Sequence, residues 1–362
     1  MGPSKMVLVL VLVPLWPRVC SAPWTGLCPD MCRCDTKDEK DLTVNCVERG
    51  LSKVPANLSQ FTTILDLSMN VVKELPERAF GQMCSLRELR LAGNRLQQIH
   101  SEAFSGLHTL TTLTLHDTGL KTVPSEALNE LKNLQSLCLD ANRLSAVPSL
   151  SFRGLSSLRL LRLEDNHLEQ TPGGALAHVP RLQALSLGMN RLKVLSPRSF
   201  HRLTELLLLQ LQHNQIHSLS PTCFYGLHQL QTLDLSFNRL HSFPSAFQLL
   251  TSLQRLNLQN NWINFIPENA LRGNPSLKKL ILLNNPLFVV GRISKLSKLP
   301  SLGFSEISQK NPEPFHQLSN YNTQESCETQ DSFWVLSLLL FITLFLTAGI
   351  LTRTILFKLK IK

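Results

Sequence analysis

One nine-residue pattern, with leucine at positions 1, 4 and 6 and asparagine at position 9, constrains this chain more than any other feature. It is clearest at Leu134–Asn142. Its last position recurs at Asn70, Asn94, Thr118, Asn142, Asn166, Asn190, Asn214, Asn238, Asn261 and Asn285. Eight of the nine intervals are 24 residues and one is 23. A fixed period of this length indicates a solenoid of stacked units, because each unit exposes an apolar face that only the next can cover.

Alternation inside each unit predicts a short parallel strand. Leu137 and Leu139 are expected to point into the core, whereas Cys138 and Asp140 point outward. A buried asparagine can both donate and accept hydrogen bonds, so it can satisfy the turning backbone that follows the strand. The pattern is that of leucine-rich repeats. We therefore predict an α/β leucine-rich-repeat solenoid, or horseshoe, over residues 61–307, with ten clear units of about 24 residues and a degenerate end.

The first 60 residues predict a secreted start and a cap. Residues 1–21 have the features of a signal peptide, with Lys5 before the apolar run Met6–Leu15, which is too short to span a membrane. Residues 22–60 form a cysteine-rich segment just before the first repeat, where a solenoid needs a cap over its exposed core end.

Four closely spaced cysteines in the cap predict disulfides: Cys28, Cys32, Cys34 and Cys46. A zinc site is the alternative, but secretion favours oxidised pairs. Asn57 begins the sequon Asn-Leu-Ser, which predicts surface glycosylation.

The other cysteines fall in three settings. Cys84 and Cys223 occupy convex-side positions and are expected to be small buried fillers. Cys138 faces outward and is a candidate free thiol. Cys327 lies six residues before a second apolar run, where it could link two chains into a dimer or remain a free or capped thiol.

The C-terminal part predicts a membrane anchor. Residues 308–332 are polar and indicate a stalk. Phe333–Leu351 carries no charge over 19 residues, so residues 333–352 are expected to form a transmembrane helix. Residues 353–362 are basic, which places them in the cytoplasm and makes the protein a type I single-pass protein of the plasma membrane. Lys358 and Lys360 also fit a dilysine signal for return to the endoplasmic reticulum, the alternative location.

The sequence favours binding over catalysis. No phosphate loop, nucleophile elbow or paired-carboxylate arrangement is present, so we predict a non-enzyme with no cofactor and no metal. His213 and His217 are four residues apart but lie across a strand end and turn, which disfavours metal binding. The formal net charge of +10 does not indicate nucleic-acid binding, because a secreted chain does not enter that compartment.

The outward strand positions contain an acidic cluster beside exposed apolar side chains. Such a surface suits a protein partner that carries basic and aromatic residues, although an ordinary solvated strand face is the alternative. The predicted ligand-binding residues are Asp140, Arg162, Glu164, Asp165, Gly188, Leu207 and Leu208.

Several non-consensus stretches resemble the ectodomain of the leucine-rich-repeat G-protein-coupled receptors that bind R-spondins. They include Leu91–Asn94, Lys121–Glu126, Leu139–Asn142, Gly273–Leu277 and Asn285–Arg292. The resemblance covers about residues 28–292. It implies R-spondin contacts at the acidic and apolar positions above, with Cys138 and Arg162 where that family tends to have Arg and Trp.

The seven-helix bundle of that family is replaced here by the predicted stalk and single helix. The resemblance therefore implies a tethered ectodomain that acts as a decoy or co-receptor in R-spondin/Wnt signalling. Two alternatives remain: a cell-adhesion or matrix-binding membrane protein, and a resident of the secretory pathway that chaperones related receptors.

Overall fold

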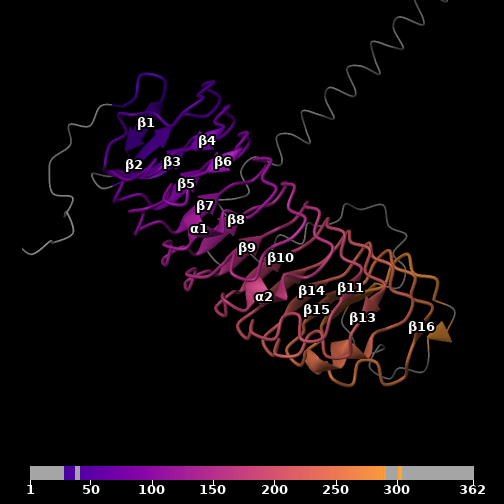
Figure 1. Ribbon diagram of the computed structural model, residues 1–362. Helices are drawn as coiled ribbons and strands as arrows, with labels where there is room; N and C mark the ends of the chain where they lie inside the picture. The colour runs from indigo at the N-terminus through magenta and orange to yellow at the C-terminus, as the bar shows by residue number, and fades with distance from the viewer. Residues whose placement is uncertain (1–27, 37–40, 288, 291–300, 304–362) are drawn as a thin grey trace, which may run out of the picture.

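A computed structural model describes residues 28–36, 41–287, 289–290 and 301–303 (Figure 1). The predicted signal peptide, stalk, membrane helix, basic tail and Cys327 lie outside these residues. Within the described ranges, none of the helices combines the length and the apolar character needed to cross a bilayer. The single-pass topology thus stays a prediction.

One sheet of 13 strands runs the length of the solenoid, coloured indigo to orange in Figure 1. β1 and β2 pair antiparallel in the cap, and β2 then pairs parallel with β3. Every later neighbour in the sheet is also parallel. The strands are β1 (Arg33–Thr36), β2 (Leu42–Asn45), β3 (Thr62–Asp66), β5 (Glu88–Arg90), β7 (Thr112–Thr114), β8 (Ser136–Cys138), β9 (Leu160–Arg162), β10 (Ala184–Ser186), β12 (Leu208–Gln210), β14 (Thr232–Asp234), β15 (Arg255–Asn257), β17 (Lys279–Ile281) and β19 (Ser301–Gly303). The predicted leucine-rich-repeat solenoid is confirmed.

The last strand extends the solenoid beyond the clear sequence pattern. β19 pairs with β17 so that Leu302 stands opposite Leu280. These residues are 22 apart, so the shortened unit puts its leucines out of phase with the 24-residue period. The degenerate end nevertheless adds one more rung.

The opposite side of the solenoid contains little helix. The short helices are α1 (Ser125–Leu128), α2 (Gly173–Leu176) and the 3₁₀ helix η1 (Ser245–Leu249). Three pairs of two-residue strands supply the rest of the regular structure: β4 (Glu74–Leu75) with β6 (Gln98–Ile99), β11 (Val194–Leu195) with β13 (Ser218–Leu219), and β16 (Phe265–Ile266) with β18 (Val289–Val290). A unit of 24 residues leaves too few residues after its strand and turns for a long helix, so the α part of the predicted class is minor.

Leucine rows and a phenylalanine spine fill the core. The largest side chains with almost no exposure are Phe80, Phe104, Phe152, Phe200, Phe224 and Phe247. Rings of adjacent units stack, with centroids 6.1 Å apart for the first pair. Deleting one buried ring would cost about 3–5 kcal/mol, since the neighbouring units cannot close the gap.

The recurring asparagines form a buried ladder between units. Asn190 shows the pattern: its amide donates to the carbonyls of Leu163, Leu187 and Gly188 at 2.9–3.1 Å. Its oxygen accepts the N–H of Leu168 at 3.0 Å. Each asparagine therefore joins its own turn to the preceding unit.

The cysteines differ partly from prediction. Cap disulfides join Cys28 to Cys34 and Cys32 to Cys46, as expected of an oxidised cap. Cys223 is a buried free thiol, also as predicted.

Two cysteine predictions are wrong. Cys138 is disulfide-bonded and fully buried, so it is not a free thiol on an open face. Cys84 is also disulfide-bonded and is only half-buried, so it is not a core filler.

Candidate functional site

The predicted ligand-binding residues lie on strands β8 to β12 and in the turns that follow them, on the concave face of the solenoid. Their positions follow from the register, which places Leu160, Ala184 and Leu208 side by side on adjacent strands. All three side chains are half-buried. They form a continuous apolar row across β9, β10 and β12, of which the prediction had singled out only Leu208.

Asp140 is not an exposed acid. Its side chain is buried, and Oδ2 contacts Nδ1 of His116 at 2.5 Å and a guanidinium nitrogen of Arg162 at 3.4 Å. Burial alone would raise the pKa of Asp140, but the His116 hydrogen bond and the Arg162 charge together hold that pKa below its ordinary value of 3.8. Asp140 is therefore a carboxylate whose charge is largely compensated within the protein.

Arg162 thus stabilises Asp140, whereas its sequence neighbour Glu164 has different partners. Glu164 accepts hydrogen bonds from Oγ of Ser186 at 2.9 Å and from Nε2 of Gln212 at 3.2 Å. Both donors are neutral, so the negative charge of Glu164 is oriented without being neutralised. The half-buried carboxylate of Glu164 is the better electrostatic anchor.

Gly188 explains how Gln212 reaches Glu164 across the intervening unit. A Cβ at residue 188 would lie 2.6 Å from Nε2 of Gln212, which is too close for any real contact. The missing side chain therefore opens the path of the Gln212 amide. Gly188 shapes the site through Gln212, and nothing in its position suggests a direct contact with a ligand.

The remaining predicted residues border this arrangement. Asp165 is exposed and has a φ of 51°, in the left-handed turn just after the strand. Leu207 is half-buried beside Leu208. Sequence reasoning missed His116 and Gln212 as partners, although each lies one or two repeat periods from the acid that it contacts. Adding 24 to each outward position would have found the first.

Other charged groups on this face are also paired. Arg90 contacts Glu88 at 2.7 Å and Asp66 at 3.4 Å, near the cap. At the other end, Asp234 accepts hydrogen bonds from Ser236 and from Asn257. The unneutralised acids around the apolar row are therefore Glu164 and Asp165.

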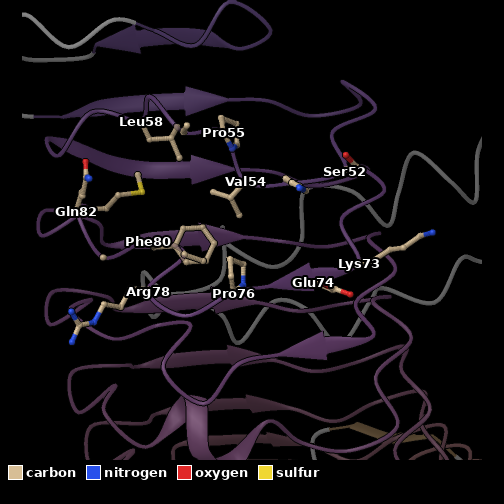
Figure 2. Close-up of a pocket in the computed structure, with 15 residues that line it drawn as sticks. Ser52, Val54, Pro55, Leu58, Lys73, Glu74, Pro76, Arg78, Phe80 and Gln82 are labelled. Carbon is tan, nitrogen blue, oxygen red and sulfur yellow. The ribbon is translucent and has the colours of Figure 1, made fainter.

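A separate pocket of about 550 Å³ lies between the cap loop and the convex side of the first units. Figure 2 shows Val54, Pro55 and Leu58 of that loop near the ring of Phe80. Asn57, the predicted glycosylation site, is exposed on the same loop, between two residues that line the pocket. The pocket contains none of the predicted ligand-binding residues.

The histidine pair that sequence analysis considered has no metal-site geometry. The ring of His213 stacks on Phe237, with centroids 4.1 Å apart. Over the described ranges, no three side chains of His, Cys, Asp or Glu are grouped as metal ligands would be.

Comparison with known proteins identifies the repeats and a partial receptor likeness. The family model described as leucine rich repeat matches residues 62–120, 84–144, 108–168, 132–192, 180–240 and 241–287. A stretch of 88 residues is 49% identical to leucine-rich repeat-containing G-protein coupled receptor 5 of Mus musculus, and covers 24% of this chain and 10% of the receptor. Receptor 4 of Bos taurus is 46% identical over 80 residues, which cover 22% of this chain and 8% of that receptor. The chain matches about a tenth of the length of these curated relatives.

Solved structures give the same fold. The Toll structure in the Toll–Spatzle complex of Drosophila has a TM-score of 0.63 and 26% identity, covering 68% of this chain and 34% of that one. A leucine-rich-repeat protein of Leptospira interrogans has a TM-score of 0.56 and 28% identity, covering 70% and 69%. With the family model matched over well over half of its residues, this chain belongs to the leucine-rich repeat family, and part of it resembles the ectodomains of the leucine-rich-repeat G-protein-coupled receptors.

Proposed function

We propose that this protein is a cell-surface binding module that holds a secreted protein ligand on its concave face. The observation that carries the proposal is the pairing of an unneutralised carboxylate, Glu164, with the apolar row Leu160, Ala184 and Leu208 on the same face. Interfaces of this kind combine apolar contact area with a few oriented charges. A ligand with an aromatic or aliphatic anchor and a nearby basic side chain would fit.

The favoured ligand class is R-spondin-like. The support is the similarity to leucine-rich-repeat G-protein-coupled receptors, together with the match of Glu164, Asp165, Leu207 and Leu208 to that family's contact positions. Arg162 and Asp140 would support this surface from below, because their charges offset each other. The protein would act as a single-pass decoy or co-receptor at the plasma membrane, with Cys327 available to join two copies.

Direct binding tests this proposal. The purified full-length protein would be immobilised and titrated with an R-spondin-type ligand by biolayer interferometry. A Glu164→Ala/Leu208→Ala variant removes the anchor acid and the centre of its neighbouring apolar row, and affinity is expected to fall at least about tenfold.

The matched control is Glu88→Ala/Ile64→Ala, which removes the same kinds of group from β5 and β3, where these two residues are register partners. Its affinity should stay within about threefold of the parent. Equal losses in both variants would mean that the ligand does not use the proposed site. An absence of binding at micromolar ligand would instead favour the adhesion or matrix-binding alternative.

A further inference from the structure

A second surface lies on the flank of the solenoid, where each unit turns away from the concave face. Buried Leu192, Ile216 and Leu240 anchor this turn in three consecutive units, so the residues on either side of them point outward. We call the outward positions of residues 189–194, 213–218 and 237–242 the lateral strip.

Backbone hydrogen bonds hold the units of the strip in register. The N–H of Gln215 donates to the carbonyl of Leu192 at 2.9 Å, and that of Arg239 donates to Ile216 at 2.8 Å. Equivalent side chains are therefore stacked one strand spacing apart. Arg191 and Arg239 occupy the same position two units apart, which separates their backbones by about 10 Å.

The cations of the strip are exposed and have no internal counter-charge. Arg191, Lys193 and Arg239 are all exposed, and none forms an ion pair with a carboxylate of the described residues. The three stretches contain no acidic residue. The preceding unit differs, because Asp165 and Glu169 stand at the corresponding positions. Positive charge is thus concentrated on this part of the flank.

Exposed rings lie among these cations. His213 and Phe237 stack with nearly parallel rings, 13° apart, and Phe237 remains 44% exposed. Trp262, at the position of Arg239 in the next unit, is 53% exposed and meets the edge of His241. Large rings left in water without a packing reason mark a contact surface. Their faces offer flat apolar area beside hydrogen-bonding groups.

We propose that the lateral strip binds a sulfated polysaccharide chain of the glycosaminoglycan type. Unpaired guanidinium and ammonium groups match sulfate and carboxylate groups, and the exposed rings can pack against sugar rings. The strip is linear, as the contact surface for a chain polymer should be. It is also narrow, since polar concave-face residues such as Gln212 and Ser236 adjoin it, whereas a membrane would need a broader face.

The disulfides favour a glycan over a nucleic acid. Cys28–Cys34 and Cys32–Cys46 are oxidised pairs, which persist in secreted and extracellular settings. Sulfated glycans are the abundant chain polyanions there. This proposal does not depend on the ligand proposed for the concave face, because the two surfaces use different residues.

Binding of a labelled heparin dodecasaccharide to the purified full-length protein tests the proposal. An Arg191→Ala/Lys193→Ala/Arg239→Ala variant should lower affinity at least about tenfold and reduce its dependence on salt. The matched control is Arg95→Ala/Lys121→Ala/Arg143→Ala, which removes the same three charges from equivalent positions of earlier units. Its affinity should fall by less than about threefold. All six side chains are exposed, so circular dichroism melts should match the parent.

A Phe237→Ala/Trp262→Ala variant separates sugar recognition from simple charge attraction. It keeps every charge, yet it should weaken heparin binding at high salt, where ring contacts contribute the larger share. Equal losses in the two triple variants would overturn the proposal, because general charge would then explain binding. Tighter binding of single-stranded RNA of equal charge, or of phosphatidylserine vesicles only, would assign the strip to another partner and also overturn it.

Discussion

The asparagine ladder leads to a paired prediction of opposite sign, because one unit of the solenoid has a threonine at the ladder position. Thr118 donates its hydroxyl to the carbonyl of Leu115 and to Oδ1 of Asn142. An asparagine at this position would also accept the N–H of Leu96, as Asn94 accepts that of Val72. In the described part of the chain the buried Leu96 N–H has no hydrogen-bond acceptor. We predict that Thr118→Asn stabilises the protein and that Asn166→Thr destabilises it.

The magnitudes follow from counting bonds. Asn166 makes four hydrogen bonds, including one that accepts the buried N–H of Leu144. A threonine would keep about two and leave that N–H unpaired, so the free energy of unfolding should fall by about 2–4 kcal/mol. Thr118→Asn gains bonds but loses its contact with Asn142, and the expected gain is about 1–2 kcal/mol.

Thermal unfolding followed by circular dichroism checks both changes. For a domain of this size the expected shifts in Tm are a fall of about 4–16 °C for Asn166→Thr and a rise of about 2–8 °C for Thr118→Asn. The comparison uses signs as well as sizes, so small departures from two-state unfolding do not blur it. A lower Tm for Thr118→Asn, or an unchanged Tm for Asn166→Thr, would refute the idea that the ladder acts through its hydrogen bonds.

Three further predictions concern single sites. Gly188→Ala should expel the Gln212 amide from its path, lower stability by about 1–2 kcal/mol, and shift the Gln212 amide resonance in NMR spectra; an unshifted resonance would contradict this. Because the pKa of Asp140 lies below 3.8, its pairing adds stability that is complete above that pH and is lost as pH falls through the folded pKa. His116→Ala should start this loss at higher pH, which melts between about pH 2 and 5 would detect. Burial raises the pKa of Cys223 to about 12, so peptide mapping at about pH 8 should find it unalkylated in the folded protein; rapid alkylation would contradict its burial.

The fold was largely predictable from sequence because its determinants are local and repeated. Alternation around Leu137 and Leu139 fixes which side of β8 is buried, and the 24-residue interval then fixes the same for each later strand. The cap cysteines needed only their spacing and an oxidising setting. β19 was not predictable in this way, because a shortened unit displaces Leu302 from the period and only strand pairing reveals its register.

The candidate site was predictable in position but not in charge. The register correctly assigned Asp140, Arg162 and Glu164 to one face. It could not show that Arg162 pairs with Asp140 instead of Glu164, since that choice depends on how long side chains cross between strands. The disulfide at Cys138 was equally inaccessible, because an outward position says nothing about what a thiol meets in space.

Pairing, more than composition, therefore decides which charges of this solenoid a partner can use. The concave face holds Asp140 and Arg90, yet both are compensated by neighbours, which leaves Glu164 and Asp165 as its usable charges. The flank has fewer charged residues, but Arg191 and its neighbours on the lateral strip have no such compensation. Two surfaces of opposite character thus arise from one repeat: strand positions meet each other across a curved sheet and neutralise, while turn positions point away from one another and stay available. A protein ligand and a polyanion could then occupy the same solenoid together.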